Sequence, residues 1–260
     1  MSTEWDASAY ERVSGPQLGW GRTVLDRIPL RGDETALDAG CGTGRVTRLL
    51  AERLPEGRVI GVDGSQAMVA EARERLADLA PRVTVRQGDL LELELDEPVD
   101  LIVSTATFHW ILDHDTLFRR LNAALRPGGR LVAQCGGAGN VAATLAVVEE
   151  VGSEEPYAEA LEGFRQTWAF AGPDETVARL EAAGFEGARA WLVEAPAHFD
   201  DVGAAGEFLR TVVVRTHAEL MPAGTADAFA REIARRSAGA DGTVTVDYVR
   251  LNMEARRPAP

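Results

Sequence analysis

The chain has 260 residues, of which 45% are hydrophobic and 26% are charged. These values are typical of a globular protein with one large α/β domain or two smaller ones. The formal net charge of −14 opposes binding to nucleic acid or to anionic membrane surfaces, because both need basic protein surfaces. The two cysteines, Cys41 and Cys135, provide no disulfide framework, and neither a leader segment nor a membrane span is visible. We therefore expect a cytoplasmic monomer or homodimer that acts on a small molecule, not on nucleic acid or a membrane.

The first half of the chain alternates between helical and extended hydrophobic patterns. The helical patterns cover 5–28, 45–53, 65–79 (with Ser65 as its N-cap) and 115–125, and the extended patterns cover 35–38, 58–62, 83–86, 99–104 and 130–134. Five strands that alternate with helices predict a parallel sheet with helices on both faces.

The alternation stops in the second half. Residues 140–172 and 202–237 look helical and amphipathic, and we expect them to form a cap over the carboxyl edge of the sheet. The intervening and final residues, 173–201 and 238–260, are expected to complete the core sheet that 1–139 begins. Their predicted elements are a helix at 173–183 and strands at 188–194 and 242–255.

A glycine-rich loop follows the first predicted strand, in the sequence Ala36-Leu-Asp-Ala-Gly-Cys-Gly-Thr-Gly-Arg45. Glycine permits a sharp turn and a close approach of a ligand to the backbone, and the helix that follows presents unpaired N–H groups. Asp63 ends the next predicted strand, where an acidic side chain can bind the hydroxyls of a ribose. The two features together predict a cofactor that contains adenosine.

The spacing of the glycines distinguishes two cofactors. Dinucleotides are bound by G-x-G-x-x-G, with a pyrophosphate at the helix N-terminus, whereas this loop reads G-x-G-x-G after Asp38. A carboxylate at that point repels phosphate and suits a cationic group such as an α-amino group. We therefore favour S-adenosylmethionine (SAM), and an NAD(P)-dependent oxidoreductase stays open as an alternative.

Two further strand ends carry polar residues, Gly88-Asp89-Leu90 and Ser104-Thr-Ala106. Ligands of open α/β sheets bind at the carboxyl ends of the strands, so these residues are expected at the same site. There Asp89 can accept a hydrogen bond from the adenine amine, and the backbone N–H of Leu90 can donate to a ring nitrogen.

With these motifs the chain resembles the class I SAM-dependent methyltransferases, and within them the small-molecule group that includes trans-aconitate methyltransferase. The resemblance covers 36–134 well and 174–185 more loosely, and it rests on Leu37-Asp-Ala-Gly-Cys-Gly-Thr-Gly44, Gly61-Val-Asp-Gly-Ser65, Gln87-Gly-Asp-Leu90, Asp100-Leu-Ile, Phe108-His-Trp-Ile111 and Leu125-Arg-Pro-Gly-Gly-Arg130. It implies a doubly wound, Rossmann-like α/β fold. Its mostly parallel sheet has seven strands, and the last of them runs antiparallel.

The resemblance also implies a set of cofactor-binding residues. Gly40 and Gly42 would contact the methionyl portion, Asp63 the ribose, and Met68 the adenine. The full set is Tyr10, Gln17, Gly40, Cys41, Gly42, Asp63, Gly64, Met68, Gly88, Asp89, Leu90 and Ser104. Of these, Tyr10 and Gln17 have the weakest match, and an exposed position on an amphipathic helix is their alternative.

His109 and Trp110 follow the fourth strand, where relatives place the reactive methyl group. His109 can act as a general base if the acceptor is a hydroxyl or an acidic C–H. The alternative is that it only packs beside the cofactor, because a carboxylate acceptor needs no base. The His and Asp residues around 109–115 do not have the spacing of a known metal site, so we expect no metal.

The acceptor is expected under the cap. Candidate contacts are Trp110, Gly136, Trp168 and Arg210, since glycine after a strand allows close approach and arginine can bind a carboxylate or phosphate bidentately. The competing interpretation is that Trp168 belongs to the core of the cap and that Arg210 pairs with an acid on an exposed helix.

The sequence thus predicts a SAM-dependent methyltransferase (EC 2.1.1) with a small-molecule acceptor and S-adenosylhomocysteine (SAH) as product. O-methylation of a carboxylate or hydroxyl is the leading expectation. C- or N-methylation of a natural-product intermediate, and a SAM-binding protein without methyl transfer, are the alternatives.

Overall fold

The computed structural model describes residues 5–165 and 167–260. They fall into two compact units. Unit 1 comprises the chain up to Ala138, then Trp168–Val193 and Arg250–Pro260; unit 2 comprises Gly139–Thr167 and Glu194–Val249. The predicted division at 139/140 lies one residue from this boundary. In contrast, 168–172, expected in the cap, group with unit 1, whereas 194–201 and 238–249, expected in the core, group with unit 2.

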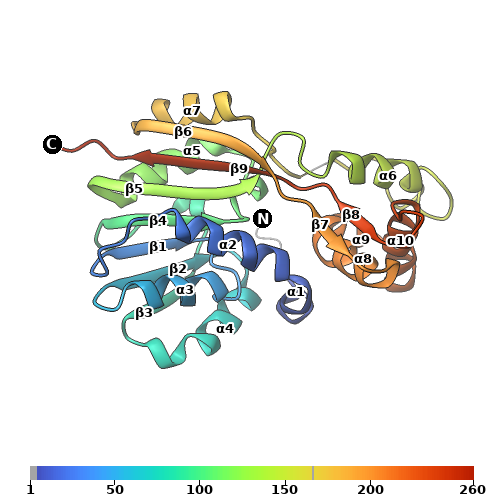
Figure 1. Cartoon of the computed structure of the whole chain (residues 1–260), viewed down its shortest axis with the longest axis horizontal. Helices are drawn as coiled ribbons and strands as arrows, with labels where there is room; N and C mark the ends of the chain where they lie inside the picture. The colour runs from blue at the N-terminus through green and yellow to red at the C-terminus, as the bar shows by residue number, and fades with distance from the viewer. Residues whose placement is uncertain (1–4, 166) are drawn as a thin grey trace. The chain divides into compact units, whose positions relative to one another are not determined.

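The central element of unit 1 is a sheet with the strand order β3-β2-β1-β4-β5-β9-β6 (Figure 1). Strands β1 to β5 pair in parallel, and β9 runs antiparallel to β5. The strands are β1 (Thr35–Ala39), β2 (Arg58–Asp63), β3 (Val83–Gln87), β4 (Val99–Thr105), β5 (Leu125–Gly136), β6 (Glu186–Glu194) and β9 (Val249–Arg256). The predicted doubly wound, mostly parallel seven-stranded sheet is thereby confirmed, including its antiparallel last strand.

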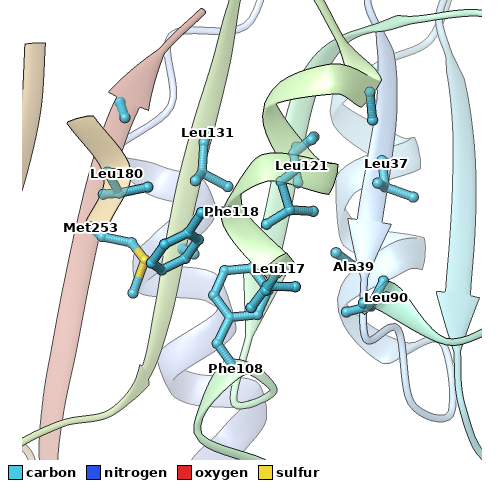
Figure 2. Packing of buried hydrophobic residues seen from close by; sticks show 14 of the residues in the cluster. Leu37, Ala39, Leu90, Phe108, Leu117, Phe118, Leu121, Leu131, Leu180 and Met253 are labelled. Atoms are coloured by element: carbon cyan, nitrogen blue, oxygen red, sulfur yellow. The ribbon is translucent and has the colours of Figure 1, made fainter. Parts of the chain in front are cut away.

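Helices cover both faces of this sheet, and a separate hydrophobic core lies on each face. One core joins β1, β2 and β4 to α2 (Gly15–Asp26), α3 (Arg45–Arg53) and α4 (Gln66–Arg75), through residues such as Leu25 and Leu50. The other joins β1, β4, β5 and β9 to α5 (His114–Ala124) and α7 (Pro173–Ala182). In Figure 2 Phe118 of α5 lies among Phe108, Leu117, Leu180 and Met253 in this second core. The central strands β1 and β4 are therefore buried on both faces, as their apolar sequences predict, whereas the edge strand β6 is largely exposed.

Several boundaries differ from the predicted ones for local reasons. The N-terminal helical segment divides at Ser14 into α1 (Ala7–Val13) and α2, because Gly15-Pro16 starts a new helix. Ser65 caps α4 as predicted, by accepting from the Met68 N–H, but the helix gives way to a 3₁₀ turn, η1 (Ala77–Leu79). Two more 3₁₀ turns, η2 (Leu90–Glu92) and η3 (Phe108–Trp110), follow β3 and β4.

Unit 2 is mainly helical, but its helices are shorter than expected. The stretch expected to be helical over 140–172 contains α6 (Ala142–Gly152) and then turns. The stretch over 202–237 contains α8 (Val202–Phe208), a π-helical turn η4 (Leu209–Val213), α9 (Arg215–Ala218) and α10 (Ala223–Arg236). Pro222 separates the last two, since proline cannot donate a backbone hydrogen bond. Within the described part of the chain, no helix is both long and apolar enough to cross a membrane.

The tail predicted as one strand over 242–255 is divided between two sheets. Its first part, β8 (Val244–Val246), pairs with β7 (Ala197–Phe199) in unit 2, and its second part is β9. Asp247 lies between them and explains the interruption. Its carboxylate accepts hydrogen bonds from the backbone N–H groups of Ala143 and Thr144, at 2.7 and 3.0 Å, and so caps α6.

Candidate active site

A pocket opens in unit 1 at the carboxyl ends of β1 and β4. It is bounded by the glycine-rich loop, by the end of β4 and by residues of the N-terminal helices. Its lining consists of Tyr10, Ser14, Gln17, Leu18, Gly40, Cys41, Gly42, Thr43, Arg45, Val46, Thr105 and Ala106. The structure therefore brings five of the predicted cofactor residues together: Tyr10, Gln17, Gly40, Cys41 and Gly42.

Two glycines of the loop have separate reasons to be glycine. Gly40 has φ = +85°, and a Cβ there would lie 2.1 Å from Thr107 Oγ1, so only glycine fits. Gly42 also has a positive φ, of +53°, but a Cβ there would meet nothing within 4 Å. The backbone at Gly42 is thus open on the side where a side chain would stand, which leaves room for a ligand to approach it.

Asp63 holds the loop in place. One oxygen of its carboxylate accepts from the backbone N–H of Gly42 at 2.9 Å, and the other accepts from the N–H of Ser65 at 2.9 Å. The preceding residue, Val62, accepts from the N–H groups of Gly40 and Cys41 through its carbonyl oxygen. The end of β2 therefore fixes the position of the turn that follows β1.

Asp38 lies below the loop and is fully buried. Its Oδ2 accepts from the Thr47 hydroxyl at 2.7 Å, while its Oδ1 finds no hydrogen-bond donor among the described residues. Burial raises the pKa of Asp38 to about 6, against the lowering effect of the Thr47 hydrogen bond. The carboxylate predicted to attract a cationic group is thus held at an energetic cost, with one oxygen still available.

Tyr10 and Gln17 come from α1 and α2 and form the opposite wall of the pocket. Gln17 is buried, and its Oε1 has no donor among the residues that the structure describes. Burial raises the pKa of Tyr10 to about 12, so its phenol is neutral at pH 7. Their position at the pocket favours the cofactor role predicted for them over an exposed surface role.

The residues predicted to bind adenine gather around the ends of β2 and β3, outside the lining of the pocket. Met68 and Leu90 are buried, and Gly88 donates its N–H to the Asp63 carbonyl at 3.0 Å. Gly64 accepts from the Gln87 amide at 3.1 Å. Asp89 is exposed and its carboxylate caps η2 by accepting from the Leu91 N–H at 2.9 Å.

Ser104 uses its hydroxyl within the sheet. The side chain is buried and donates to the Ala39 carbonyl at 2.6 Å, which joins the ends of β4 and β1. The next two residues, Thr105 and Ala106, line the pocket. The sequence analysis identified this strand end but selected Ser104 from it. Side chains alternate between the two faces of a strand, so the structure was needed to show which of these residues line the pocket.

His109 is buried in η3 and is neutral at pH 7. Its Nδ1 accepts from the backbone N–H of Gly136 at 3.3 Å. Burial lowers the pKa of His109 well below its usual value, and the charges of Arg250 and His114 lower it further. Since Nδ1 is an acceptor, the proton of the neutral ring lies on Nε2, and neither nitrogen has a free lone pair. In this arrangement the Nε2–H of His109 can donate a hydrogen bond.

Aromatic side chains from three parts of unit 1 surround His109. The ring of Phe170 stacks on it with a centroid distance of 5.9 Å, and Trp110 lies 5.2 Å away. Trp168 contacts both Trp110 and Phe170, and Trp5 contacts Trp110. The backbone hydrogen bond from Ala169 to the His109 carbonyl, 2.8 Å long, holds the segment in place. Of the predicted acceptor contacts, Trp110 and Gly136 therefore contact His109 directly, and Trp168 contacts the Trp110 and Phe170 rings beside it.

Arg210, the fourth predicted acceptor contact, belongs to unit 2. There its Nε lies 3.3 Å from an Asp227 carboxylate oxygen, which is the acidic pairing that the sequence left open as its alternative.

Neither buried cysteine is a thiolate at pH 7. Burial raises the pKa of Cys41 well above its usual value and that of Cys135 to about 12. Among the described residues there is also no group of three His, Cys, Asp or Glu side chains suited to a metal ion.

Sequence reasoning gave no role to Arg250 of β9, a charged residue near this site. It is 2% exposed and its guanidinium lies 4.4 Å from the centre of the Trp20 ring. The available signal was an arginine within a predicted strand of a sheet with helices on both faces, but the tail was interpreted only as an alternating last strand.

The energetic cost of Asp38 gives a first testable prediction. Replacing Asp38 with Asn keeps an acceptor for Thr47 and removes the buried charge, so we expect the free energy of unfolding at pH 7.5 to rise by about 1–3 kcal/mol. The folded pKa lies above the unfolded one, so the wild-type chain loses stability as the pH rises from about 4 to 6. Urea unfolding should therefore show the gain at pH 7.5 and little of it at pH 4. The exposed Asp33→Asn is the control, and equal gains at both pH values would contradict the assignment.

Comparison with known proteins agrees with this geometry. Residues 36–129 match a family described as a methyltransferase domain. Over 130 residues the chain is 42% identical to a trans-aconitate 2-methyltransferase from Azoarcus sp. (strain BH72), which covers 50% of each protein. It is 36% identical over 157 residues to the protein of the same name from Variovorax paradoxus (strain S110), covering 60% of this chain and 59% of that one. The chain thus spans about half the length of the curated relatives it matches.

Among solved structures, the fold is similar to that of phosphoethanolamine N-methyltransferase 2 from Haemonchus contortus in complex with S-adenosyl-L-methionine. The TM-score is 0.63 at 21% identity, and the match covers 97% of this chain and 56% of the other. At this identity the likeness concerns the fold alone. Taken together, the comparisons show that residues 36–129 match a methyltransferase domain and that about half of the chain is similar to trans-aconitate 2-methyltransferases.

Proposed function

We propose that the protein transfers a methyl group from SAM to a small-molecule acceptor and that the acceptor atom is a carboxylate oxygen. The observation that carries the proposal is the pocket at the carboxyl ends of β1 and β4, whose glycine loop is held by Asp63. Trans-aconitate methyltransferase relatives support the same chemistry.

The residues present fit SAM. Bound there, SAM supplies a methyl group on a positively charged sulfur. Gly40, Cys41 and Gly42 would contact its methionyl portion, and the buried oxygens of Gln17 and Asp38 that lack a donor would accept from its α-amino group. The Asp63 carboxylate has further acceptor capacity for the ribose hydroxyls, since each of its oxygens has two lone pairs. Around the adenine, Gly64, Met68, Gly88, Asp89 and Leu90 are proposed, with Ser104 supporting the end of β4.

The state of His109 favours a carboxylate acceptor over a hydroxyl. An alcohol must lose its proton during methyl transfer, and the ring of His109 offers no free nitrogen to take it. A carboxylate is ionised at pH 7 and needs no base. We propose that the N–H of His109 positions the acceptor and that Trp110 and Trp168 exclude water around it. The helical segments of unit 2, with Arg210, are proposed as a cap, and the cytoplasmic location remains a prediction from the sequence.

The proposal is tested by incubating the protein with SAM and a panel of acceptors and following SAH and product mass. We expect methyl esters from carboxylic acids such as trans-aconitate. Products methylated on nitrogen or carbon would favour the alternative acceptors. Tight binding of SAH without turnover on any acceptor would favour a SAM-binding protein that does not transfer methyl groups, and a preference for NAD in calorimetry would overturn the proposal.

Asp63→Ala tests the cofactor site. The substitution removes the proposed hydrogen bonds to the ribose and frees the N–H of Gly42, so SAH binding measured by calorimetry should weaken by about 1.5–3 kcal/mol. The matched control is Asp33→Ala, an exposed carboxylate paired with Arg31 in unit 1. Unchanged SAH affinity in a folded Asp63→Ala protein would exclude the ribose assignment.

The pH dependence of turnover tests the role of His109. With SAM and acceptor saturating, we expect the rate constant to be flat between pH 7 and 9, because the pKa of His109 lies well below this range and that of Tyr10, about 12, lies above it. His109→Gln keeps an N–H donor and should retain turnover within about 10-fold, whereas loss of a general base costs about 100-fold or more. A rate that rises with a single ionisation near neutral pH, and that His109→Gln abolishes, would show that the ring is the base.

A further inference from the structure

The sheet of unit 1 contains a buried arginine beside the candidate active site. The side chains of β9 alternate, and Leu251, Met253 and Ala255 enter the core on the side of α5 and α7. Arg250 and Asn252 are therefore directed to the opposite face, where α2 lies. Arg250 is 2% exposed, and its guanidinium is 4.4 Å from the ring centre of Trp20 in α2. Its guanidinium is therefore a permanent positive charge buried at the carboxyl edge of the sheet, beside the candidate site.

The register of β9 against β5 places Arg250 next to the reaction centre. Arg250 is the cross-strand partner of Gly136, the last residue of β5. The backbone N–H of this same glycine donates to Nδ1 of His109. Gly136, at the carboxyl edge of the sheet, thus donates a hydrogen bond to His109 and pairs with Arg250 on the neighbouring strand.

Electrostatics agree with this placement. The charge of Arg250 lowers the pKa of His109 and opposes the effect of burial on the pKa values of Tyr10 and Cys135. Tyr10 lines the pocket, and Cys135 immediately precedes Gly136. The guanidinium therefore lies close to both the pocket wall and the ring that is proposed to position the acceptor.

A second arginine contacts the same face of β9 and provides a comparison for Arg250. Arg27 of unit 1 lies over Trp191, with 5.2 Å to the ring centre, and its Nη1 donates to Asn252 Oδ1 at 2.6 Å. Its Nε lies 3.6 Å from a Glu254 carboxylate oxygen, and its side chain is 25% exposed. Arg27 is thus a partly exposed arginine with an acidic partner, further along β9 from the site.

We propose that Arg250 binds a carboxylate of the acceptor, and that this carboxylate is a different one from the carboxylate that is methylated. The proposal rests on the proposed function and narrows it to acceptors with two or more carboxylates. Arginine matches a carboxylate with two parallel N–H donors. The group it holds cannot be the nucleophile, because the guanidinium withdraws negative charge from the oxygens it binds. The reacting carboxylate must therefore be a second one, placed toward the methyl group.

The test compares Arg250→Gln and Arg250→Lys with the matched control Arg27→Gln, using trans-aconitate as a tricarboxylate and crotonate as a monocarboxylate. Binding of each acid to the SAH-loaded protein is followed by calorimetry, and KM and kcat are measured with SAM. We expect Arg250→Gln to weaken trans-aconitate binding and raise its KM about 10- to 100-fold, because hydrogen bonds to a charged group are lost. Arg250→Lys should recover part of this loss, and Arg27→Gln and the crotonate values should change less than about 3-fold.

The SAH affinity and the melting temperature of each variant separate this role from two others. A methionyl carboxylate of the cofactor is the other source of the same chemistry, and a large loss of SAH affinity in Arg250→Gln would assign Arg250 to it and overturn the proposal. Equal trans-aconitate binding in folded wild-type and Arg250→Gln proteins would also overturn it, as would failure of wild type to bind any polycarboxylate. If wild type binds trans-aconitate through Arg250 but does not methylate it, the binding site stands and the proposed function fails.

Discussion

The hydrogen bonds from the end of β2 to the glycine loop are the constraint on which the site depends. The Asp63 carboxylate and the Val62 carbonyl accept the N–H groups of Gly42, Gly40 and Cys41, and so determine how the chain turns after β1. Without them the loop would have to satisfy these donors in other ways, and the pocket that it bounds would lose its shape. The same carboxylate is proposed to bind the ribose, so that the residue that builds the loop also recognises what enters it.

Much of the sheet domain could be predicted from the sequence because its signals are local. Apolar strands, glycines at turns and the cap at Ser65 each depend on a few neighbouring residues, and the strands and helices were found near the predicted positions. The tail could not be predicted in the same way. Its division into β8 and β9 depends on Asp247 capping α6, a contact between residues about a hundred positions apart that no periodicity reveals. The prediction of long helices in unit 2 was wrong at two places, the turns after Gly152 and the break at Pro222.

The residues of the candidate site likewise fall into those that a local motif predicts and those that only tertiary contacts bring together. Gly40, Gly42 and Asp63 were visible as a motif, whereas the neighbourhood of His109 is assembled by tertiary contacts. The bond from Ala169 to the His109 carbonyl brings Trp168 and Phe170 to η3, and the pairing of β5 with β9 brings Arg250. In the sequence Arg250 is one polar residue of an alternating strand, and only the register shows which residues it faces.

Three buried polar groups lie at or near this site. Asp38, Gln17 and Arg250 each carry a desolvation cost that an apolar side chain would avoid. The charges and dipoles of these side chains complement those of the two proposed ligands. Oxygens on Asp38 and Gln17 stand where a cationic α-amino group is proposed, and a guanidinium stands near His109, where an anionic acceptor is proposed. His109 itself is neutral at pH 7, and its Nδ1 accepts a hydrogen bond from the Gly136 N–H. If Arg250 binds an anion and His109 is not a base, as proposed, the site favours an acceptor that is ionised before it binds, which is the property that separates a carboxylate from an alcohol.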